Sequence, residues 1–127
     1  MGSFTAEELN YLLGERRLGR LATIDRTGLP HVVPVGMWRY NSDLGTIDVS
    51  GHGFAGTRKF RNVQANPKAA FIVDDLASVQ PWRPRAVMVQ GGAEAVISSP
   101  GDGDGDDALI RITPEKVISW GLDSGQR

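Results

Sequence analysis

Apolar residues near the start of the chain, and again in its middle, recur at the spacing of one helical face. The segment Thr5–Glu8 has the pattern of a capping box, in which the first hydroxyl and the last carboxylate each bond a backbone amide of the other residue. Leu9–Leu13 then places its leucines on one face, and Gly14 is a suitable end. A second helix is predicted over Thr57–Ala65, which begins with a good N-cap residue and ends before Asn66.

The other segments of hydrophobic residues are typical of β-strands. They are rich in Val, Ile and aromatic residues, and turns containing Gly, Asn, Asp or Pro separate them. The pattern predicts six strands: Leu18–Asp25, His31–Tyr40, Thr46–Ser50, Lys68–Asp74, Arg85–Val96 and a final region within Ile110–Trp120. Thr113–Glu115 is expected to break the final region, because its central proline has no amide to donate.

Single residues refine these strands. Pro34 indicates an edge strand, a bulge or an opening of the sheet, because it lacks the amide that a ladder needs. Gly91-Gly92 predicts a bulge. The uninterrupted apolar run of Lys68–Asp74 predicts a strand covered on both faces, and we interpret Asp74 and Asp75 as turn formers at its end.

The order of these elements favours a β-rich barrel or sandwich with helical additions, since strands and helices do not alternate as in a βαβ fold. The 127 residues suit one domain, 1–127. The acidic tract 100–107 is expected to be a flexible, solvated loop, because its aspartates alternate with glycine and lack the bidentate glutamate of a calcium loop.

Composition narrows the classes of function. The net charge of -1 gives no strong field to attract nucleic acid or an anionic membrane, so neither is an expected partner. The absence of cysteine excludes disulfides, thiolate metal sites and thiol nucleophiles, and fits a reducing compartment. No apolar run approaches the roughly 20 residues of a membrane helix. We therefore expect a cytoplasmic protein.

Candidate chemistry gathers where a glycine-rich bend leads into the second predicted helix. The bend 51–56 contains three glycines, and the helix start carries Thr57, Arg58, Lys59 and Arg61. Helix N-termini favour anions, and basic side chains there are unfavourable for the helix itself. A bound phosphate would neutralise these cations. A solvated basic helix face is the alternative that the residues alone leave open.

Four segments together resemble the pyridoxamine 5'-phosphate oxidase-like superfamily, which contains flavin and deazaflavin oxidoreductases. They occur in the order and at nearly the spacing of that superfamily: Gly19–Thr23, Gly28–Val35, Thr57–Lys59 through Asn66-Pro67, and Arg85–Val89 with Gly91 and Ala93-Glu94. Asp74-Asp75 with Trp82-Arg83, and the segment Val117–Leu122, are similar to the actinobacterial branch that uses the deazaflavin coenzyme F420.

The resemblance implies a fold and an assembly. The fold is mainly β (α+β): a six-stranded antiparallel split β-barrel of the FMN-binding type, with short flanking helices. The assembly is a homodimer whose cofactor site lies at the subunit interface. The implied activity is hydride transfer between reduced F420 and a small unsaturated substrate.

The resemblance also implies roles for particular residues. Thr57, Arg58 and Lys59 fall where the oxidases have a Ser-Arg-Lys phosphate clamp. The backbone of Val33, Pro34, Val35 and Gly36 would lie against the isoalloxazine or deazaflavin ring, and Ser50 and Gly51 beside the ribityl chain. Trp82 would approach the site from the other subunit, although an interface anchor is an equally good interpretation of a tryptophan.

Departures from the oxidase pattern affect the choice of cofactor. Ala86 stands where the oxidases have a glutamine that contacts FMN, which favours a deazaflavin over FMN. The segment between Ser50 and Thr57 is longer than theirs. The sequence also lacks the arginine-containing extension that grips pyridoxal phosphate, so oxidation of pyridoxamine phosphate is not the expected reaction.

We identify no catalytic side chain and no metal site. His31 and His52 are interpreted as structural or exposed, since no Ser/His/Asp set is arguable. An FMN-dependent oxidoreductase of the same fold and a non-catalytic flavin or deazaflavin carrier remain alternatives. FMN would make the purified protein yellow, and a carrier would bind the reduced coenzyme without turnover.

Overall fold

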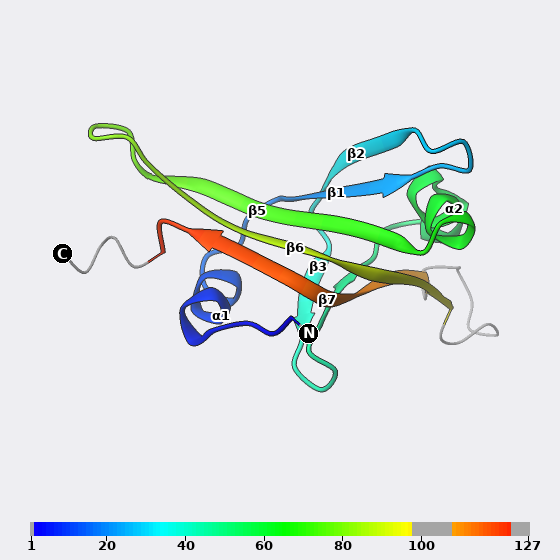
Figure 1. Ribbon diagram of the computed structural model, residues 1–127, viewed down its shortest axis with the longest axis horizontal. Helices are drawn as coiled ribbons and strands as arrows, with labels where there is room; N and C mark the ends of the chain where they lie inside the picture. The colour runs from blue at the N-terminus through cyan, green and yellow to red at the C-terminus, as the bar shows by residue number, and fades with distance from the viewer. Residues whose placement is uncertain (1, 98–107, 123–127) are drawn as a thin grey trace.

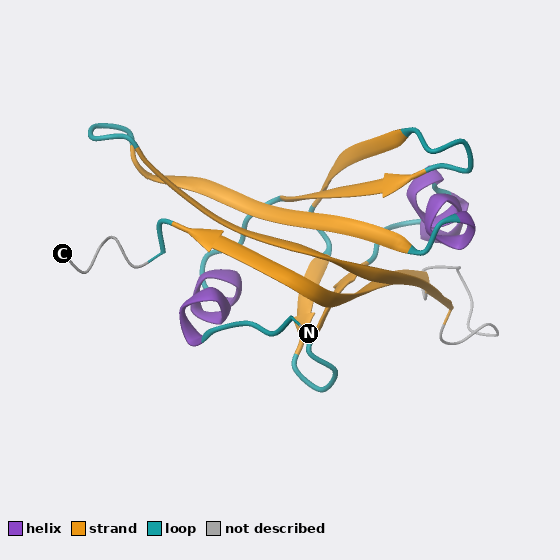
Figure 2. Cartoon of the chain, in the orientation of Figure 1, coloured by secondary structure: helices purple, strands orange, loops and turns teal. Residues whose placement is uncertain are grey.

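The computed structural model describes residues 2–97 and 108–122, so the predicted loop 100–107 lies outside the described residues. Two α-helices and a short 3-10 helix accompany seven strands (Figures 1 and 2). The elements are α1 (Ala6–Leu13), β1 (Gly19–Ile24), β2 (Pro30–Val35), β3 (Trp38–Asn41), β4 (Thr46–Val49), η1 (Phe54–Gly56), α2 (Arg58–Ala65), β5 (Lys68–Ser78), β6 (Arg83–Ile97) and β7 (Ala108–Trp120). Neither α-helix has the length and apolar character needed to cross a membrane.

All seven strands belong to one antiparallel sheet in the order β2-β1-β5-β6-β7-β4-β3, which curls into a half-barrel (Figure 1). The mainly β prediction is confirmed, but the predicted count of six strands is wrong. The run His31–Tyr40 is not one strand, because the chain bends at Gly36 and Met37. The bend lets β2 pair with β1 at one edge of the sheet while β3 pairs with β4 at the other edge.

The core lies on the inner face of this sheet. Leu21, Phe71 and Val89 meet across β1, β5 and β6, and all three are buried. The ring of Trp38 packs edge-on against Phe71, with 5.3 Å between ring centroids. Alternate residues of each strand point inward, which is why the period-two pattern predicts this core.

The prediction that Lys68–Asp74 is covered on both faces is not met within one chain. Ala69, Phe71 and Val73 are buried, whereas Ala70 and Ile72 on the outer face are only half-buried. The apolar residues of β5 therefore include an outer row that the described residues cover only in part.

The expected bulge lies at the level of Gly91, but its extra residue is Glu115 of β7, and the expected break at Thr113–Glu115 does not occur. The register of β6 with β7 shifts between Gln90 and Gly91, and β7 continues through Pro114. A Cβ on Gly91 would lie 2.0 Å from the carbonyl oxygen of Thr113, so only glycine fits at this close approach. The irregular pairing at the bulge accommodates the missing amide of the proline, so the strand continues on both sides of it.

The interpretation of Asp74 and Asp75 as turn formers is wrong. Both lie within β5, which extends to Ser78. The carboxylate of Asp75 accepts hydrogen bonds from Arg85 at 2.6 and 2.9 Å and from Arg17 at 2.9 Å. These long-range partners keep the charged side chain on a strand where sequence alone suggests an end.

Both predicted helices are confirmed with their caps. Thr5 accepts from the amide of Glu8 at 3.1 Å, and the Glu8 carboxylate accepts from the amide of Thr5 at 2.8 Å. Thr57 is the N-cap of α2, which packs against β1 and β6. Pro34 lies on the edge strand β2, as its missing amide requires.

Candidate functional site

The bend between β2 and β3 brings the end of β4 beside the predicted ring-binding segment. Val33 and Val35 face the core, whereas Pro34 and Gly36 are exposed. The amide of Ser50 donates to the carbonyl oxygen of Met37 at 2.8 Å. The structure therefore brings the predicted residues of β2 and the predicted Ser50 to one place.

Arg16 holds this bend from the other side, a role that the sequence did not indicate. Its guanidinium donates to the carbonyl oxygen of Gly36 at 2.7 Å and also to the carbonyl oxygen of Trp38. The same guanidinium lies 4.6 Å from the centre of the Trp38 ring. Two carbonyl contacts and a cation-π contact fix the backbone where the chain crosses between sheet edges.

Buried Asp48 braces the strand that leads to Ser50. Its carboxylate accepts from Asn41 at 3.0 Å, from Thr46 at 2.9 Å and from Arg111 at 3.1 and 3.2 Å. Burial alone would raise the pKa of Asp48, but the hydrogen bonds from Arg111, Asn41 and Thr46 outweigh it and lower that pKa. Asp48 is therefore a charged structural group at neutral pH.

An aromatic contact connects the end of β4 to the start of α2. A Cβ on Gly51 would lie 3.2 Å from the Phe54 ring, so glycine leaves room for this ring. Phe54 is buried and packs edge-on against Phe60, and the ammonium of Lys59 lies 5.3 Å from the centre of the Phe54 ring. The Phe54 ring therefore lies between Gly51, which follows Ser50, and Lys59.

The start of α2 has donors without acceptors. The Thr57 hydroxyl accepts from the amide of Phe60 at 3.3 Å and donates to the carbonyl oxygen of Phe54 at 2.7 Å. The first turn carries no acidic residue. Within residues 2–97 and 108–122, neither the amides nor the side chains of Arg58 and Lys59 have a carboxylate partner. This helix start can accept an anion.

Arg58 and Lys59 lie on different sides of α2. Lys59 lies over Phe54, whereas Arg58 lines a pocket of about 680 Å³ between α2 and the β1–β2 turn. We call this hollow the arginine pocket; it is lined by Asp25, Arg26, Thr27, Arg58, Arg61, Asn62, Gln64 and Ala65. The predicted clamp is therefore divided within this chain. Arg26 was missed in the sequence because it is 32 residues from Arg58.

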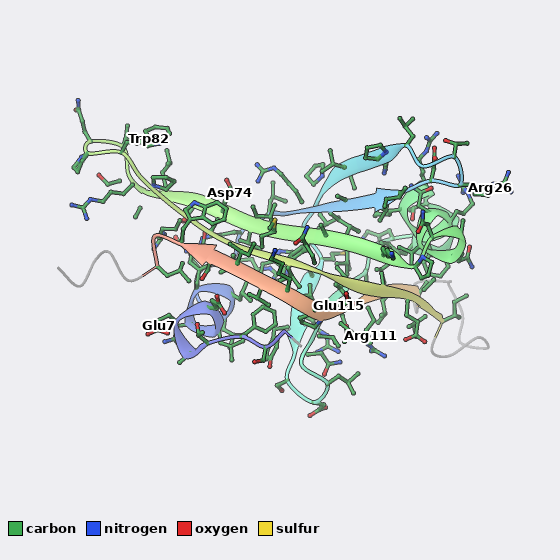
Figure 3. All side chains as sticks on the ribbon, in the orientation of Figure 1. Glu7, Arg26, Asp74, Trp82, Arg111 and Glu115 are labelled. Atoms are coloured by element: carbon green, nitrogen blue, oxygen red, sulfur yellow. The ribbon has the colours of Figure 1, made fainter. Side chains whose placement is uncertain are left out.

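Trp82 lies far from the other predicted site residues of the same chain. It is 67% exposed and belongs to the turn of the β5–β6 hairpin, at the opposite end of the molecule from Arg26 (Figure 3). The contact of Trp82 with the site across a subunit boundary stays a prediction.

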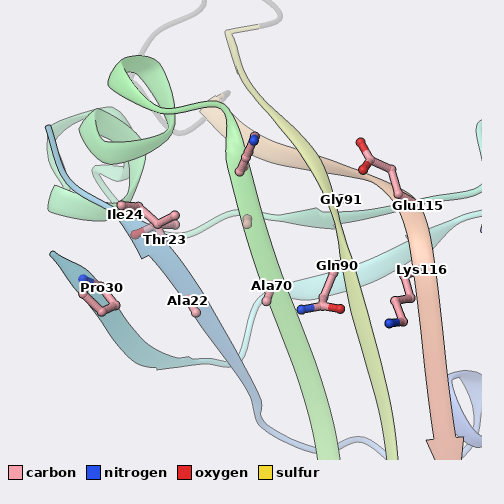
Figure 4. Close-up of a pocket in the computed structure, with 11 residues that line it drawn as sticks. Ala22, Thr23, Ile24, Pro30, Ala70, Gln90, Gly91, Glu115 and Lys116 are labelled. Carbon is pink, nitrogen blue, oxygen red and sulfur yellow. The ribbon is translucent and has the colours of Figure 1, made fainter. Parts of the chain in front are cut away.

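A second hollow, of about 460 Å³, lies across β1, β2, β5, β6 and β7 (Figure 4). Its lining is largely apolar, with Lys68, Gln90, Glu115 and Lys116 supplying the long polar side chains. None of these four was a predicted site residue. In the described part of the chain, no three His, Asp or Glu side chains gather as a metal site would require.

The sequence model of pyridoxamine 5'-phosphate oxidase matches residues 5–121. This chain belongs to that family. The family resemblance seen in the sequence is therefore confirmed over almost the whole chain, including β2, the bend and the start of α2.

A protein named as a reductase is similar to this chain over most of its length. The 5a,11a-dehydrotetracycline/5a,11a-dehydrooxytetracycline reductase of Streptomyces rimosus is 38% identical over 122 residues, which cover 94% of this chain and 84% of that protein.

Two solved structures share the fold. A conserved hypothetical protein from Mycobacterium tuberculosis superposes with a TM-score of 0.73 at 19% identity, covering 98% of this chain and 89% of the other. A structure described as an F420 reductase has a TM-score of 0.65 at 21% identity, covering 86% of this chain and 94% of the other. These likenesses confirm the split-barrel fold.

Proposed function

We propose that this protein is an oxidoreductase that binds coenzyme F420 and reduces an electron-poor C=C or C=N bond of a small molecule. An oxidoreductase function is supported by the family and by the 38% identical relative, which is a reductase. The deazaflavin is supported by the neighbour described as an F420 reductase and by Ala86, whose methyl group offers no hydrogen bond to a flavin.

The observation that carries the proposal is the start of α2. Among the described residues, Arg58 and Lys59 form no ion pair and their two amides have no acceptor; Asp25 acts on Arg58 only across the arginine pocket. An unneutralised cation pair at a positive helix end is unfavourable unless an anion is bound. A coenzyme phosphate at this helix end would accept from the two amides, with Lys59 and Arg58 approaching it from different sides of α2.

The other residues of this region position the coenzyme in the proposal. The exposed backbone at Pro34 and Gly36 would lie against the ring, where Pro34 has a carbonyl but no amide to offer. Ser50 and Gly51 line the path between the bend and Lys59. When bound in its reduced form, the deazaflavin supplies a hydride from C5 to the substrate. Solvent supplies the proton, so no side chain is assigned as an acid.

The proposed assembly is a homodimer with small-molecule substrate bound near the interface. The outer face of the sheet carries Ile72, Met88, Ile118 and Trp120 in adjacent positions of β5, β6 and β7. Ile118 and Trp120 are 36% and 46% exposed. A second copy would cover this face and would bring Trp82 toward the neighbouring coenzyme.

Titration of the purified protein with F420 and with FMN, followed by fluorescence, tests the cofactor. We expect binding of F420 at micromolar concentration or tighter, and oxidation of reduced F420 by a panel of cyclic enones. A yellow protein that binds only FMN would show that the cofactor is FMN and not F420. Tight binding of reduced F420 with no turnover would indicate a carrier, and binding of neither coenzyme would contradict the proposal.

A further inference from the structure

The arginine pocket has one wall that its own hydrogen bonds hold in shape. The carboxylate of Asp25 accepts from the amide of Thr27 at 2.8 Å, from its hydroxyl at 2.7 Å and from the amide of Leu29 at 3.0 Å. Gly28 completes the turn with a φ of 91°, a left-handed value that favours glycine. Arg26 therefore projects from a turn that is ordered without any ligand.

The second wall, α2, is fixed to the sheet by a buried contact. The side-chain amide of Asn62 donates to the hydroxyl of Thr23 at 3.0 Å. Arg58 and Arg61 are three residues apart and so lie on one face of the helix. Arg61 donates one hydrogen bond to the carbonyl oxygen of Gly56 at 2.8 Å, and its other N–H groups can bind a ligand.

The pocket carries excess positive charge. Three arginines line it against a single acidic residue, Asp25. The hydrogen bonds from Thr27 and Leu29 lower the pKa of Asp25, and Arg58 contributes to the same shift, so Asp25 is ionised at neutral pH. Its oxygens are already engaged in the turn. Within the described ranges, no carboxylate forms an ion pair with Arg26, Arg58 or Arg61.

We propose that the arginine pocket is a binding site for a small polyanion, a molecule with at least two phosphate or carboxylate groups. Guanidinium groups from two walls would converge on such a ligand, and each can bind a phosphate or carboxylate with two parallel hydrogen bonds. A single monoanion would leave part of the charge unbalanced. Only Ala65 adds an apolar side chain, which disfavours a hydrophobic ligand.

The site shares Arg58 with the coenzyme phosphate proposed above, but it adds Arg26 and Arg61 on the side of α2 away from Lys59, so it goes beyond that phosphate. The polyanion has two possible sources with the same chemistry. It is either an acidic tail carried by the bound coenzyme or an independent small molecule. Pyrophosphate is a suitable probe for both, because it places two phosphate groups on one compact ion.

Calorimetric titration of the full-length protein with pyrophosphate tests the proposal. We expect saturable binding at about 1 mM or below, and an affinity loss of about tenfold or more in Arg26→Ala. Arg83→Ala is the matched control, because Arg83 is an exposed arginine outside this pocket. Circular dichroism would establish that Arg26→Ala is folded. No saturation in the wild type, or equal losses in both variants, would overturn the proposal.

Repeating the titration with the protein saturated by F420 identifies the source. Competition between pyrophosphate and F420 assigns the pocket to acidic groups of the coenzyme, and independent binding assigns it to a separate polyanion. The two proposals can fail independently. If F420 does not bind but pyrophosphate binds in a way that depends on Arg26, the polyanion site stands while the proposed function falls.

Discussion

The indole nitrogen of Trp38 donates a hydrogen bond of 2.8 Å to the carbonyl oxygen of Arg17. This contact joins β3 to the segment between α1 and β1, and the neighbouring Arg16 binds the carbonyl oxygen of Gly36 from the same segment. Thus the Trp38 side chain binds the backbone of the segment before β1, and the Arg16 side chain of that segment binds the backbone of the bend. The bend is the part of the backbone that the proposed function places against the coenzyme ring.

Replacing Arg16 by alanine tests whether an ordered bend matters for coenzyme binding. Loss of the charged contacts to Gly36 and Trp38 should weaken F420 binding by about 1 to 2 kcal/mol, measured by fluorescence titration. Glu15→Ala is the control, because Glu15 is an exposed neighbour whose carboxylate pairs with Arg17 at 3.6 Å and not with the bend. An Arg16→Ala protein with unchanged affinity would show that the bend needs no such support.

The cluster around Asp75 predicts a dependence of stability on pH. The hydrogen bonds from Arg85, with those from Arg17 and Tyr11, lower the pKa of Asp75 from 3.8 to about 2. Because the folded pKa lies below the unfolded one, this stabilisation is complete above about pH 5 and is lost as the pH falls toward 2. In urea unfolding, the free energy of unfolding of the wild type should exceed that of Asp75→Asn by less as the pH falls through that window. The expected decrease in this difference is about 1 to 2 kcal/mol, a modest value because solvent partly screens the cluster.

The neighbouring carboxylate provides the control for this measurement. Asp74 forms an exposed ion pair with Arg20 at 2.6 Å. Asp74→Asn should change the free energy of unfolding by less than about 1 kcal/mol. Equal effects of the two substitutions on the free energy of unfolding would mean that the Asp75 cluster stabilises the protein no more than an exposed ion pair does.

The bulge at Gly91 can be tested with two adjacent glycines. Gly91→Ala should lower the free energy of unfolding by about 2 to 4 kcal/mol, because the new methyl group collides with the carbonyl of Thr113. Gly92→Ala should have a much smaller effect, since the nearest atom to its Cβ is a side-chain oxygen of Glu115 at 3.6 Å. Similar thermal stability of both variants would argue against the register shift.

The outer face predicts self-association. We expect the wild type to sediment as a dimer at micromolar concentration and Ile118→Lys to shift it toward monomer, because a charge would enter the proposed interface. Leu44→Lys places the same charge at a residue that is 56% exposed in the β3–β4 turn, and it should remain dimeric. A wild type that sediments only as monomer would remove the proposed interface and the shared site.

Local patterns predicted the local structure of this protein well. The capping box at Thr5, the N-cap at Thr57 and the bulge at Gly91 all depend on residues close in sequence or on glycine chemistry. The missing amide of Pro34 left an edge strand, a bulge or an opening of the sheet as alternatives, and the structure has the edge strand. These features are readable because their physical causes act within a few residues.

Features that depend on distant partners were not predictable in this way. The sequence around Asp75 predicts a turn, because its partners Arg17, which is 58 residues away, and Arg85 are brought to it only by the fold. The bend at Gly36 follows from the pairing of β3 with β4 at the far sheet edge, which no local pattern records. The arginine pocket likewise joins a turn and a helix that only the folded sheet brings together.

The account rests most on the two cations at the start of α2, and removing both tests it directly. Titration of Arg58→Ala/Lys59→Ala with F420 should show binding weaker than wild type by about 2 to 4 kcal/mol, the scale of losing charge-assisted hydrogen bonds. The double variant Lys68→Ala/Lys116→Ala removes two exposed cations away from this helix start and should bind as wild type does. If the Arg58→Ala/Lys59→Ala protein is folded and binds F420 as tightly as wild type, this helix start does not hold the coenzyme.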